Sequence, residues 1–346
     1  MNWRKLLLPF SGLWWIITEV RNGLYNARIF PSKKFKKPVI IIGNLSLGGT
    51  GKSPHVIHVL SILHSFYKVA ALSRGYGRRT KGFKVANYDS TATEIGDEPM
   101  QFFNRFKNRI VVSVGEDRVE AIKKLSKLFK LDVFVLDDAF QHRRLRTDMN
   151  IVLTDFRQRY TKDFLVPTGY LRESARNARR AQIIIVTKCP DDLAEKDKQL
   201  IRKELRIRQK QSLFFSKIIY ADTLEHRKFP IPMTESKKLN VLSITGIASP
   251  EHFVEYLKLN FNKVHSMTFP DHYIFKEDDI KQILTAFHHI EGEKIILTTE
   301  KDYMRLRHEY SIVDNLYYLP ISIKIDKEEE FNHLIFNYVQ GFRTSH

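Results

Sequence analysis

A glycine-rich segment that ends in lysine and serine carries the clearest chemical signal in the sequence. It runs from Gly43 to Ser53 (GNLSLGGTGKS), follows the apolar run 39–42, and precedes residues with helical periodicity. Glycines allow successive backbone N–H groups to surround phosphate oxygens, and the N-terminus of the following helix favours an anion. This order of strand, loop and helix predicts a phosphate-binding P-loop.

Two side chains at the end of this loop have specific expected roles. Lys52 would reach the β- and γ-phosphates of a nucleotide, and the Ser53 hydroxyl would ligate Mg²⁺. The other nucleotide-binding positions that we expect are Gly48, Gly49, Thr50 and Gly51. Ser46 stands where the general pattern has its first glycine. A glycine-rich turn without a ligand is the alternative, which the complete strand, loop and helix context disfavours.

Another apolar run, 133–136, ends in the adjacent carboxylates Asp137 and Asp138. After a P-loop, such a strand end is typical of a Walker-B element, whose acid lies beside Mg²⁺ at the carboxyl edge of the sheet. Polar and basic residues follow at once, so His142 is expected at the same edge. A purely structural role is an equal alternative for this histidine.

Two more carboxylates, Asp97 and Glu98, stand in a turn-like segment before Pro99. They could hold Mg²⁺ through water or accept a proton from an attacking hydroxyl. From these residues alone, a solvated helix start is the alternative.

Two basic segments, 73–79 (SRGYGRR) and 167–173 (PTGYLRE), interleave arginine with glycine and tyrosine. Arginine offers a planar fork that matches phosphate oxygens. Glycine and tyrosine beside it allow close approach and contact with a sugar. Arg74, Tyr76 and Arg172 are therefore candidate phosphate or substrate contacts, with a solvated run of charge as the alternative.

In the second half of the chain, two polar segments each follow an expected strand: 269–273 (FPDHY) and 298–302 (TTEKD). Ligands bind at the carboxyl ends of strands in open α/β sheets. His272 beside Asp271 could therefore act as an acid–base or orienting group. A lone histidine after a strand is more often structural.

The elements that must position these residues alternate along the chain. Short apolar runs typical of buried strands lie at 39–42, 69–72, 110–114, 133–136, 151–153 and 183–186. Helical periods separate several of them, which indicates a P-loop NTPase-type parallel sheet covered on both faces. A second series of strands and helices follows between 241 and 319. The fold class is therefore α/β, with a P-loop lobe and a second, smaller α/β lobe.

The domain boundaries follow from changes in composition. A charged, helix-like stretch at 194–211 precedes a segment interrupted by Pro230 and Pro232. We expect an N-terminal helix over residues 1–30, a P-loop lobe over 31–216, a linker over 217–239 and the second lobe over 240–346.

Charge is unevenly distributed over the 346 residues, whose formal net charge is +18. Residues 1–37 hold eight basic side chains and one acidic side chain, and residues 143–180 hold ten basic and four acidic side chains. This pattern indicates an anionic partner. An apolar share of 43% excludes a mainly disordered chain, and the single cysteine, Cys189, excludes a disulfide framework.

The N-terminal segment is apolar without being long enough to span a membrane. Its run 6–17 would measure roughly 18 Å as a helix, whereas the hydrocarbon core is about 30 Å thick. Trp14 and Trp15, with Arg and Lys nearby, suit an amphipathic helix in the membrane interface. A terminal helix docked on the protein's own core is the alternative.

Taken together, these motifs resemble the tetraacyldisaccharide 4'-kinase family, the lipid A 4'-kinases of Gram-negative bacteria. The matching segments run in order over 43–302: GNLSLGGTGKSP, LSRGYGR, GDEP, LDDAFQH, PTGYLRES, TKCP, TGIASPEHF, FPDHY and TTEKD. The family often has glycine where Ala139 stands. The resemblance implies transfer of the γ-phosphate of ATP to the 4'-hydroxyl of a tetraacyl glucosamine disaccharide 1-phosphate, in lipid A biosynthesis. It also implies a peripheral protein whose N-terminal helix rests on the anionic cytoplasmic face of the inner membrane, without nucleic acid or an obligate protein partner.

The resemblance further implies roles for the candidate residues. Asp97 would be the base for the 4'-hydroxyl, with His272 coupled to it. Glu98 and the Asp137–Asp138 pair would serve Mg²⁺ and the nearby charge, and Arg172 would be one of the phosphate-facing groups.

Two other functions are open to the residues alone. A P-loop ATPase acting on nucleic acid would explain the net charge, but it leaves the apolar N-terminal helix without a role. A nucleotide-dependent switch would need no base for a hydroxyl, so Asp97→Ala should leave its hydrolysis largely intact.

Overall fold

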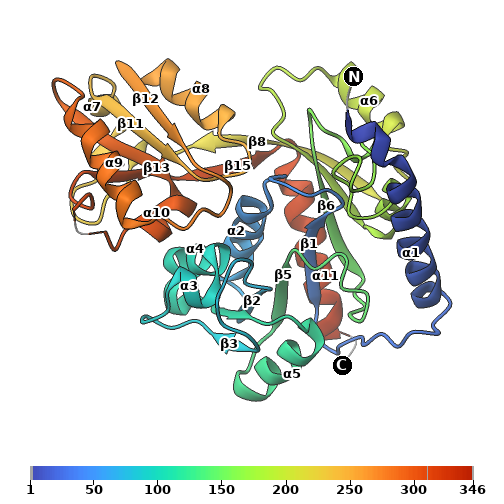
Figure 1. Cartoon of the computed structure of the whole chain (residues 1–346). Helices are drawn as coiled ribbons and strands as arrows, with labels where there is room; N and C mark the ends of the chain where they lie inside the picture. The colour runs from blue at the N-terminus through green and yellow to red at the C-terminus, as the bar shows by residue number, and fades with distance from the viewer. Residues whose placement is uncertain (1–2, 310, 345–346) are drawn as a thin grey trace.

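The motifs lie on two α/β lobes in a computed structural model, which describes residues 3–309 and 311–344 (Figure 1). The larger lobe is built on a nine-stranded sheet. Its strands are β1 (Val39–Asn44), β2 (Val69–Ser73), β3 (Lys84–Val85), β4 (Val111–Val114), β5 (Val133–Asp137), β6 (Met149–Asp155), β7 (Ile183–Thr187), β8 (Ser212–Tyr220) and β15 (Ile321–Ile325). In space they follow the order β15-β8-β7-β6-β1-β5-β2-β4-β3.

The interior of this sheet is parallel, as the sequence predicts. Every pairing from β8 across to β4 is parallel, and the edge strands β15 and β3 pair antiparallel. Strand β1 is buried along its whole length, which agrees with a parallel sheet covered on both faces. The helices of this lobe are α2 (Lys52–Leu63), α3 (Ala92–Ile95), α4 (Asp97–Phe106), α5 (Arg118–Leu128), α6 (Glu195–Glu204) and α11 (Glu328–Thr344), with short 3₁₀ turns at Trp3–Leu7, Lys107–Arg109, Tyr160–Lys162 and Ala175–Arg180.

The smaller lobe has a parallel sheet of order β12-β11-β13-β14. Its elements are β11 (Asn240–Thr245), α8 (Glu251–Asn260), β12 (Lys263–Thr268), α9 (Glu277–His288), β13 (Lys294–Thr299), α10 (Glu300–Leu306) and β14 (Leu316–Leu319). A two-stranded sheet of β9 (Thr223–Leu224) and β10 (Ile231–Pro232), followed by α7 (Met233–Ser236), precedes them.

The end of the chain differs from the division expected from the sequence. Strand β15 pairs with β8, and α11 packs on the larger lobe, so both return from the region 240–346 to the first sheet. Helix α11 buries Phe331, Ile335 and Val339, which lie at helical spacing on one face. The expected linker 217–239 likewise begins inside β8. The elements predicted from the sequence end at residue 319, so β15 and α11 are not among them.

Helix α1 (Leu8–Asn26) contacts the larger lobe through polar side chains. The Ser11 hydroxyl donates to the Leu165 carbonyl at 2.9 Å, and the Asn22 amide donates to Glu173 at 3.0 Å. The large apolar side chains of this segment are exposed instead: Leu6, Leu8, Phe10, Leu13, Trp14, Trp15, Ile16, Ile17 and Val20. The buried residues of the helix are polar, and its large apolar side chains face away from the protein. Among the described residues, no helix combines the length and the apolarity needed to cross a membrane.

Candidate active site

The P-loop connects β1 to α2 and takes its shape from glycine. Gly48 and Gly51 have φ angles of 100° and 79°, a left-handed conformation that glycine adopts without steric cost. The Asn44 amide donates to the Thr50 hydroxyl at 2.8 Å, and the Thr187 hydroxyl donates to the Thr50 carbonyl at 3.0 Å. The loop is thus held open by neighbouring strands, with Lys52 at the start of the helix.

The loop faces a cleft of about 1030 Å³ that is lined by both lobes. Most residues proposed from the sequence line this cleft: Gly48, Gly49, Thr50, Gly51, Lys52, Ser53, Arg74, Tyr76, Glu98, Asp137, Asp138, His142, Arg172 and His272. Asp97 is buried and is not among the residues that line the cleft, but it contacts His272, which lines it. Segments far apart in sequence therefore meet at one place.

Asp138 is held between two basic side chains. Nη1 of Arg172 lies 2.9 and 3.0 Å from its two carboxylate oxygens, and Nζ of Lys52 lies 3.8 Å from Oδ2. Burial acts to raise the pKa of Asp138, but Lys52 and Arg172 outweigh it and hold the pKa below its ordinary value. Asp138 therefore remains ionised and fixes the positions of both cations.

Asp137 has the opposite electrostatic environment. Burial, together with the nearby charges of Glu98 and Asp138, raises the pKa of Asp137 to about 7. Its Oδ1 is buried without a hydrogen-bond partner, and the Ser73 hydroxyl is 3.5 Å from Oδ2. A divalent cation would neutralise the negative charge gathered here and bind the unpartnered Oδ1 of Asp137, so these residues fit Mg²⁺. No set of three or more His, Cys, Asp or Glu side chains in the described part of the chain could hold a metal ion, so nucleotide oxygens would complete the ligand set.

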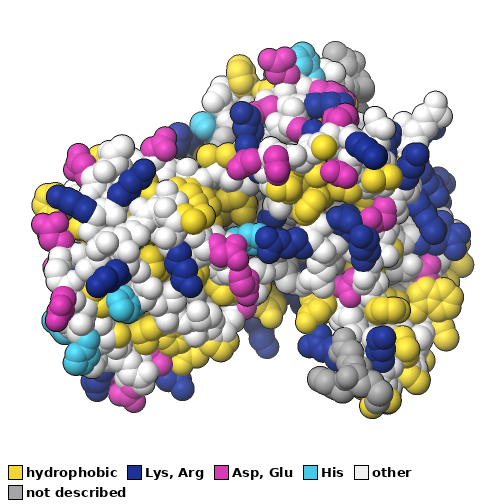
Figure 2. Space-filling model, turned by 90° about the horizontal axis from the view of Figure 1, so that it is seen from above, with side chains coloured by type: hydrophobic (Ala, Val, Ile, Leu, Met, Phe, Trp, Pro, Cys, Tyr) yellow, Lys and Arg dark blue, Asp and Glu magenta, His cyan; other side chains and the backbone are white. Residues whose placement is uncertain are grey.

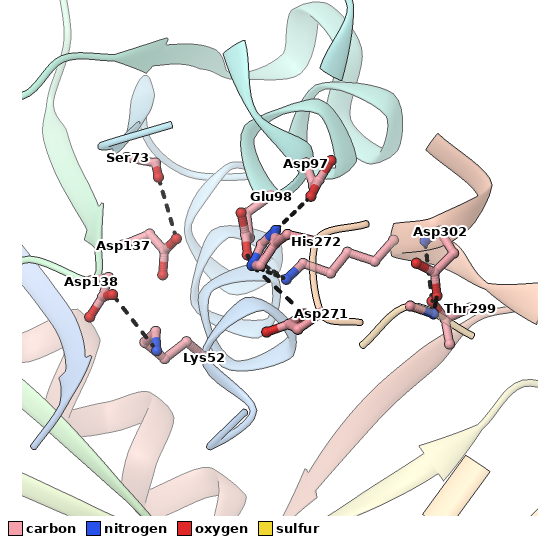
Figure 3. Close-up of polar contacts among 12 residues, drawn as sticks. Lys52, Ser73, Asp97, Glu98, Asp137, Asp138, Asp271, His272, Thr299 and Asp302 are labelled. Carbon is pink, nitrogen blue, oxygen red and sulfur yellow. Dashed lines mark hydrogen bonds and ion pairs between the residues drawn. The ribbon is translucent and has the colours of Figure 1, made fainter. Parts of the chain in front are cut away.

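Asp97, from the first turn of α4, meets His272 of the smaller lobe (Figure 3) and also Arg305 of the same lobe. Nδ1 of His272 lies 2.8 Å from Asp97 Oδ2, and Nη2 of Arg305 lies 2.5 Å from the same oxygen. Burial alone would raise the pKa of Asp97, but the bonds to His272 and Arg305 lower it to about 2. The Tyr76 ring packs against the His272 ring, with 4.8 Å between centroids.

Further polar contacts fasten α4 to α10 across the lobes. Lys301 Nζ is 2.6 Å from Glu98 Oε1, and Glu300 accepts hydrogen bonds from Gln101 and Arg105. Asp302, which has no exposed surface, accepts the Gly246 N–H at 3.0 Å and the Thr299 hydroxyl at 2.8 Å. These bonds hold the start of α10, and hence Lys301 and Arg305, in a fixed orientation.

His142 and Arg74 line the same cleft with fewer contacts. Burial and the positive charge of Arg118 lower the pKa of His142 to about 4, so its imidazole is neutral at neutral pH. Its Nε2 is 3.6 Å from Asp117. Arg74 is exposed at the cleft, close enough to Arg118 for their charges to repel.

Sequence reasoning missed two arginines of this site. Arg305 follows Asp302 at the i, i+3 spacing of a helix, and its Nη1 lies 2.9 Å from that carboxylate, a pairing that the spacing could have indicated. Arg118 lines the cleft from the start of α5, where its guanidinium bonds the Gly115 and Glu116 carbonyls. We find no sequence signal that would have singled out Arg118.

Comparisons with known proteins identify the family of the chain. The model of the family "Tetraacyldisaccharide-1-P 4'-kinase" matches residues 3–340. The tetraacyldisaccharide 4'-kinases of Flavobacterium johnsoniae and Bacteroides thetaiotaomicron are 42% and 39% identical to this chain; each alignment covers 97% of it and 97% and 93% of the relatives. A crystal structure of LpxK from Aquifex aeolicus in complex with ATP superposes with a TM-score of 0.79 at 32% identity, covering 97% of this chain and 99% of that one.

The family match, the relatives and the shared fold all indicate the same family, and they confirm the resemblance that the motifs show. The chain belongs to the tetraacyldisaccharide-1-P 4'-kinase family, the kinases of lipid A biosynthesis.

Proposed function

We propose that this protein transfers the γ-phosphate of ATP to the 4'-hydroxyl of a tetraacyl disaccharide 1-phosphate at a membrane surface. One observation carries the proposal: the P-loop of the larger lobe meets, at a single cleft, a buried Asp–His pair that joins Asp97 of the same lobe to His272 of the smaller lobe. A nucleotide-hydrolysing switch has no need of the second group. The ATP held by the Aquifex aeolicus relative supports ATP as the donor.

The P-loop side of the cleft would bind the nucleotide. Lys52 would contact the β- and γ-phosphates, and Asp138 holds Lys52 and Arg172 in place for this task. Ser53, Glu98 and Asp137 would hold Mg²⁺, with Asp138 contributing charge beside them. The cation, when bound, would neutralise charge on the phosphates. Arg74, Tyr76 and His142 would contact phosphate or the sugar of the acceptor.

The opposite side of the cleft would activate the acceptor. His272 and Arg305 both bond Oδ2 of Asp97, which leaves Oδ1 of that carboxylate for the proton of the 4'-hydroxyl. Because its pKa is about 2, Asp97 stays ionised at physiological pH and can accept a hydrogen bond from the hydroxyl. His272 would orient Asp97 and support its charge as the proton moves.

Helix α1 would bring the enzyme to its lipid substrate. Its polar side is satisfied by the protein, and its apolar side, with Trp14 and Trp15, is exposed. Such a helix suits the interface of a bilayer, and the basic residues of segment 1–37 suit anionic lipids. The protein would therefore work as a peripheral protein on the cytoplasmic face of the bacterial inner membrane.

The test is a phosphate-transfer assay with γ-labelled ATP, Mg²⁺ and the acceptor in non-ionic detergent micelles. Label is expected in the lipid, and none is expected in a matched acceptor that lacks the 4'-hydroxyl. Release of the label only as free phosphate, with either acceptor, would contradict the proposal. Stimulation of that release by added DNA would instead favour an ATPase acting on nucleic acid.

A further inference from the structure

Asp302, the last residue of the segment 298–302 (TTEKD), is a carboxylate buried inside the smaller lobe. Figure 2 shows that other charged side chains and histidine gather at the hollow between the lobes, whereas Asp302 has no exposed surface. It is not among the residues that line the cleft. A buried carboxylate is costly unless bonds within the protein compensate its charge. The groups that bond Asp302 therefore indicate what it does.

One oxygen of Asp302 holds a guanidinium group. Nη1 of Arg305 lies 2.9 Å from Asp302 Oδ1, and Nη2 of the same guanidinium lies 2.5 Å from Asp97 Oδ2. Arg305 is itself nearly buried, with 8% of its side chain exposed. Because the guanidinium is planar and rigid, the bond to Asp302 sets the direction of the bond to Asp97.

The other oxygen of Asp302 reaches the second partner of Asp97 through the backbone. Oδ2 accepts the Gly246 N–H at 3.0 Å, and the Gly246 carbonyl accepts the backbone N–H of His272 at 3.2 Å. Nη1 of Arg305 donates to the same carbonyl at 3.2 Å. The peptide groups of Gly246 therefore connect Asp302 with the backbone of His272.

The backbone of His272 needs such support. Its φ angle is 58°, in the left-handed region that is costly for residues other than glycine. Such a conformation persists only where the surrounding structure maintains it. The bond from the His272 N–H to Gly246 contributes to this, and the imidazole is directed at Asp97, with Nδ1 2.8 Å from Oδ2.

The network around Asp302 has little room to shift. A Cβ atom on Gly246 would lie 3.1 Å from Asp302 Oδ1 and 3.4 Å from Arg305 Nη1. At the start of α10, the Thr299 hydroxyl donates to Asp302 Oδ2 at 2.8 Å and accepts the Asp302 N–H at 3.2 Å. The start of α10 and the residue after β11 are therefore held together tightly.

We propose that Asp302 is a positioning residue for the activation of the acceptor. Through the guanidinium of Arg305 and the peptide of Gly246, it orients both groups that bond the carboxylate base. This inference rests on the proposed function, in which Asp97 accepts the proton of the 4'-hydroxyl. A small misplacement of the base lowers the rate of the chemical step without weakening the binding of the nucleotide. Asp302 thus influences the reaction without touching a substrate.

The experiment measures phosphate transfer and ATP affinity in Asp302→Asn. This substitution keeps the shape of the side chain but removes the charge that holds Arg305. We expect kcat to fall about 10- to 100-fold, while the KM values for ATP and for the acceptor stay unchanged. Gly246→Ala removes no polar group, but its Cβ forces Asp302 to move by a few tenths of an ångström. It should lower kcat several-fold in the same way.

A double-mutant cycle separates positioning from a structural role. Because Asp302 acts through Asp97, Asp302→Asn should cost little further activity in the Asp97→Asn enzyme. An equal fractional loss in both backgrounds would show that Asp302 only supports the fold, and would overturn the inference. Unchanged kcat in both Asp302→Asn and Gly246→Ala would also overturn it, as would a loss confined to the KM for ATP.

Asp326→Asn is the matched control. Asp326 also accepts one backbone N–H, that of Phe215, and one cation, Lys198, at 3.0 Å each, but it lies in the larger lobe between β15 and α11. This variant should keep the wild-type kcat, and a loss as large as that of Asp302→Asn would overturn the inference. If Asp302→Asn does not fold, Gly246→Ala carries the same cycle. Failure of the wild-type enzyme to label the lipid would instead contradict the proposed function itself.

Discussion

The two sides of the cleft are built in different ways. The P-loop side comes from one continuous segment between β1 and α2, and its shape depends on glycines and on hydrogen bonds to adjacent strands. The Asp97 side is assembled from α4 of one lobe and from a loop and α10 of the other. Nucleotide binding is therefore a local property, whereas activation of the acceptor depends on how the lobes meet. Substitutions on the P-loop side should therefore impair nucleotide binding, whereas substitutions on the Asp97 side should impair activation of the acceptor.

The largest effect is expected from Asp97→Asn. It keeps the shape of the side chain but removes the charge that accepts the proton, so kcat should fall roughly 10²- to 10⁴-fold. ATP affinity should be nearly unchanged, because no P-loop contact is lost. Single-turnover transfer and binding of a fluorescent ATP analogue measure the two quantities. A parallel loss of ATP binding would show that the two sides are not independent.

The substitution Lys52→Ala should have the next largest effect, and it should change both kcat and the affinity for ATP. Removing one preorganised cation from the phosphates should reduce kcat about 10²- to 10³-fold, and ATP should bind more weakly. The same two assays apply, with Lys68→Ala, an exposed lysine outside the cleft, as the control. Normal ATP affinity with normal turnover in Lys52→Ala would remove the P-loop from the mechanism.

Arg305→Met tests the interlobe side alone, with an expected fall in kcat of about tenfold. Arg305 helps to hold the pKa of Asp97 near 2, so its removal should raise that pKa toward the ordinary carboxylate value. The base is active when deprotonated, and activity is lost as pH falls through its pKa. The acid limb of the kcat profile should therefore move to higher pH. Arg307→Met is the control, because Arg307 lies just after α10 and does not contact Asp97. An unshifted acid limb would assign Arg305 to structure only.

The smallest effect concerns α1. Ile17→Ser removes an exposed apolar side chain from the face proposed to enter the bilayer, so partitioning onto anionic vesicles should fall roughly five- to tenfold. Leu259→Ser, at an exposed leucine on the smaller lobe, should leave the partitioning unchanged. Sedimentation with vesicles measures both variants. Equal losses in the two variants would argue against a specific role for α1.

The same contrast between local and interlobe features explains what the sequence could predict. Each of three features depends on one continuous stretch of residues: the P-loop, the parallel strands and the acids at the end of β5. The predictions of these features agree with the fold. Motif order also identified Asp97 and His272 as partners, through the family resemblance. The bond from Arg305 to Asp97 joins residues far apart in the chain, so no local pattern contains it. Likewise, the predicted series of elements ends at residue 319, and the packing of β15 and α11 on the larger lobe depends on the whole fold.

The outward apolar side of α1 has a consequence for handling the protein at the bench. Nine large apolar side chains in this segment are exposed, from Leu6 to Val20, and they form a contiguous stripe of a kind that proteins in water seldom leave uncovered. We expect the purified protein to cover this stripe with detergent, or to form oligomers when detergent is withdrawn. Its apparent size on a gel-filtration column should therefore report on the detergent concentration more than on any native assembly.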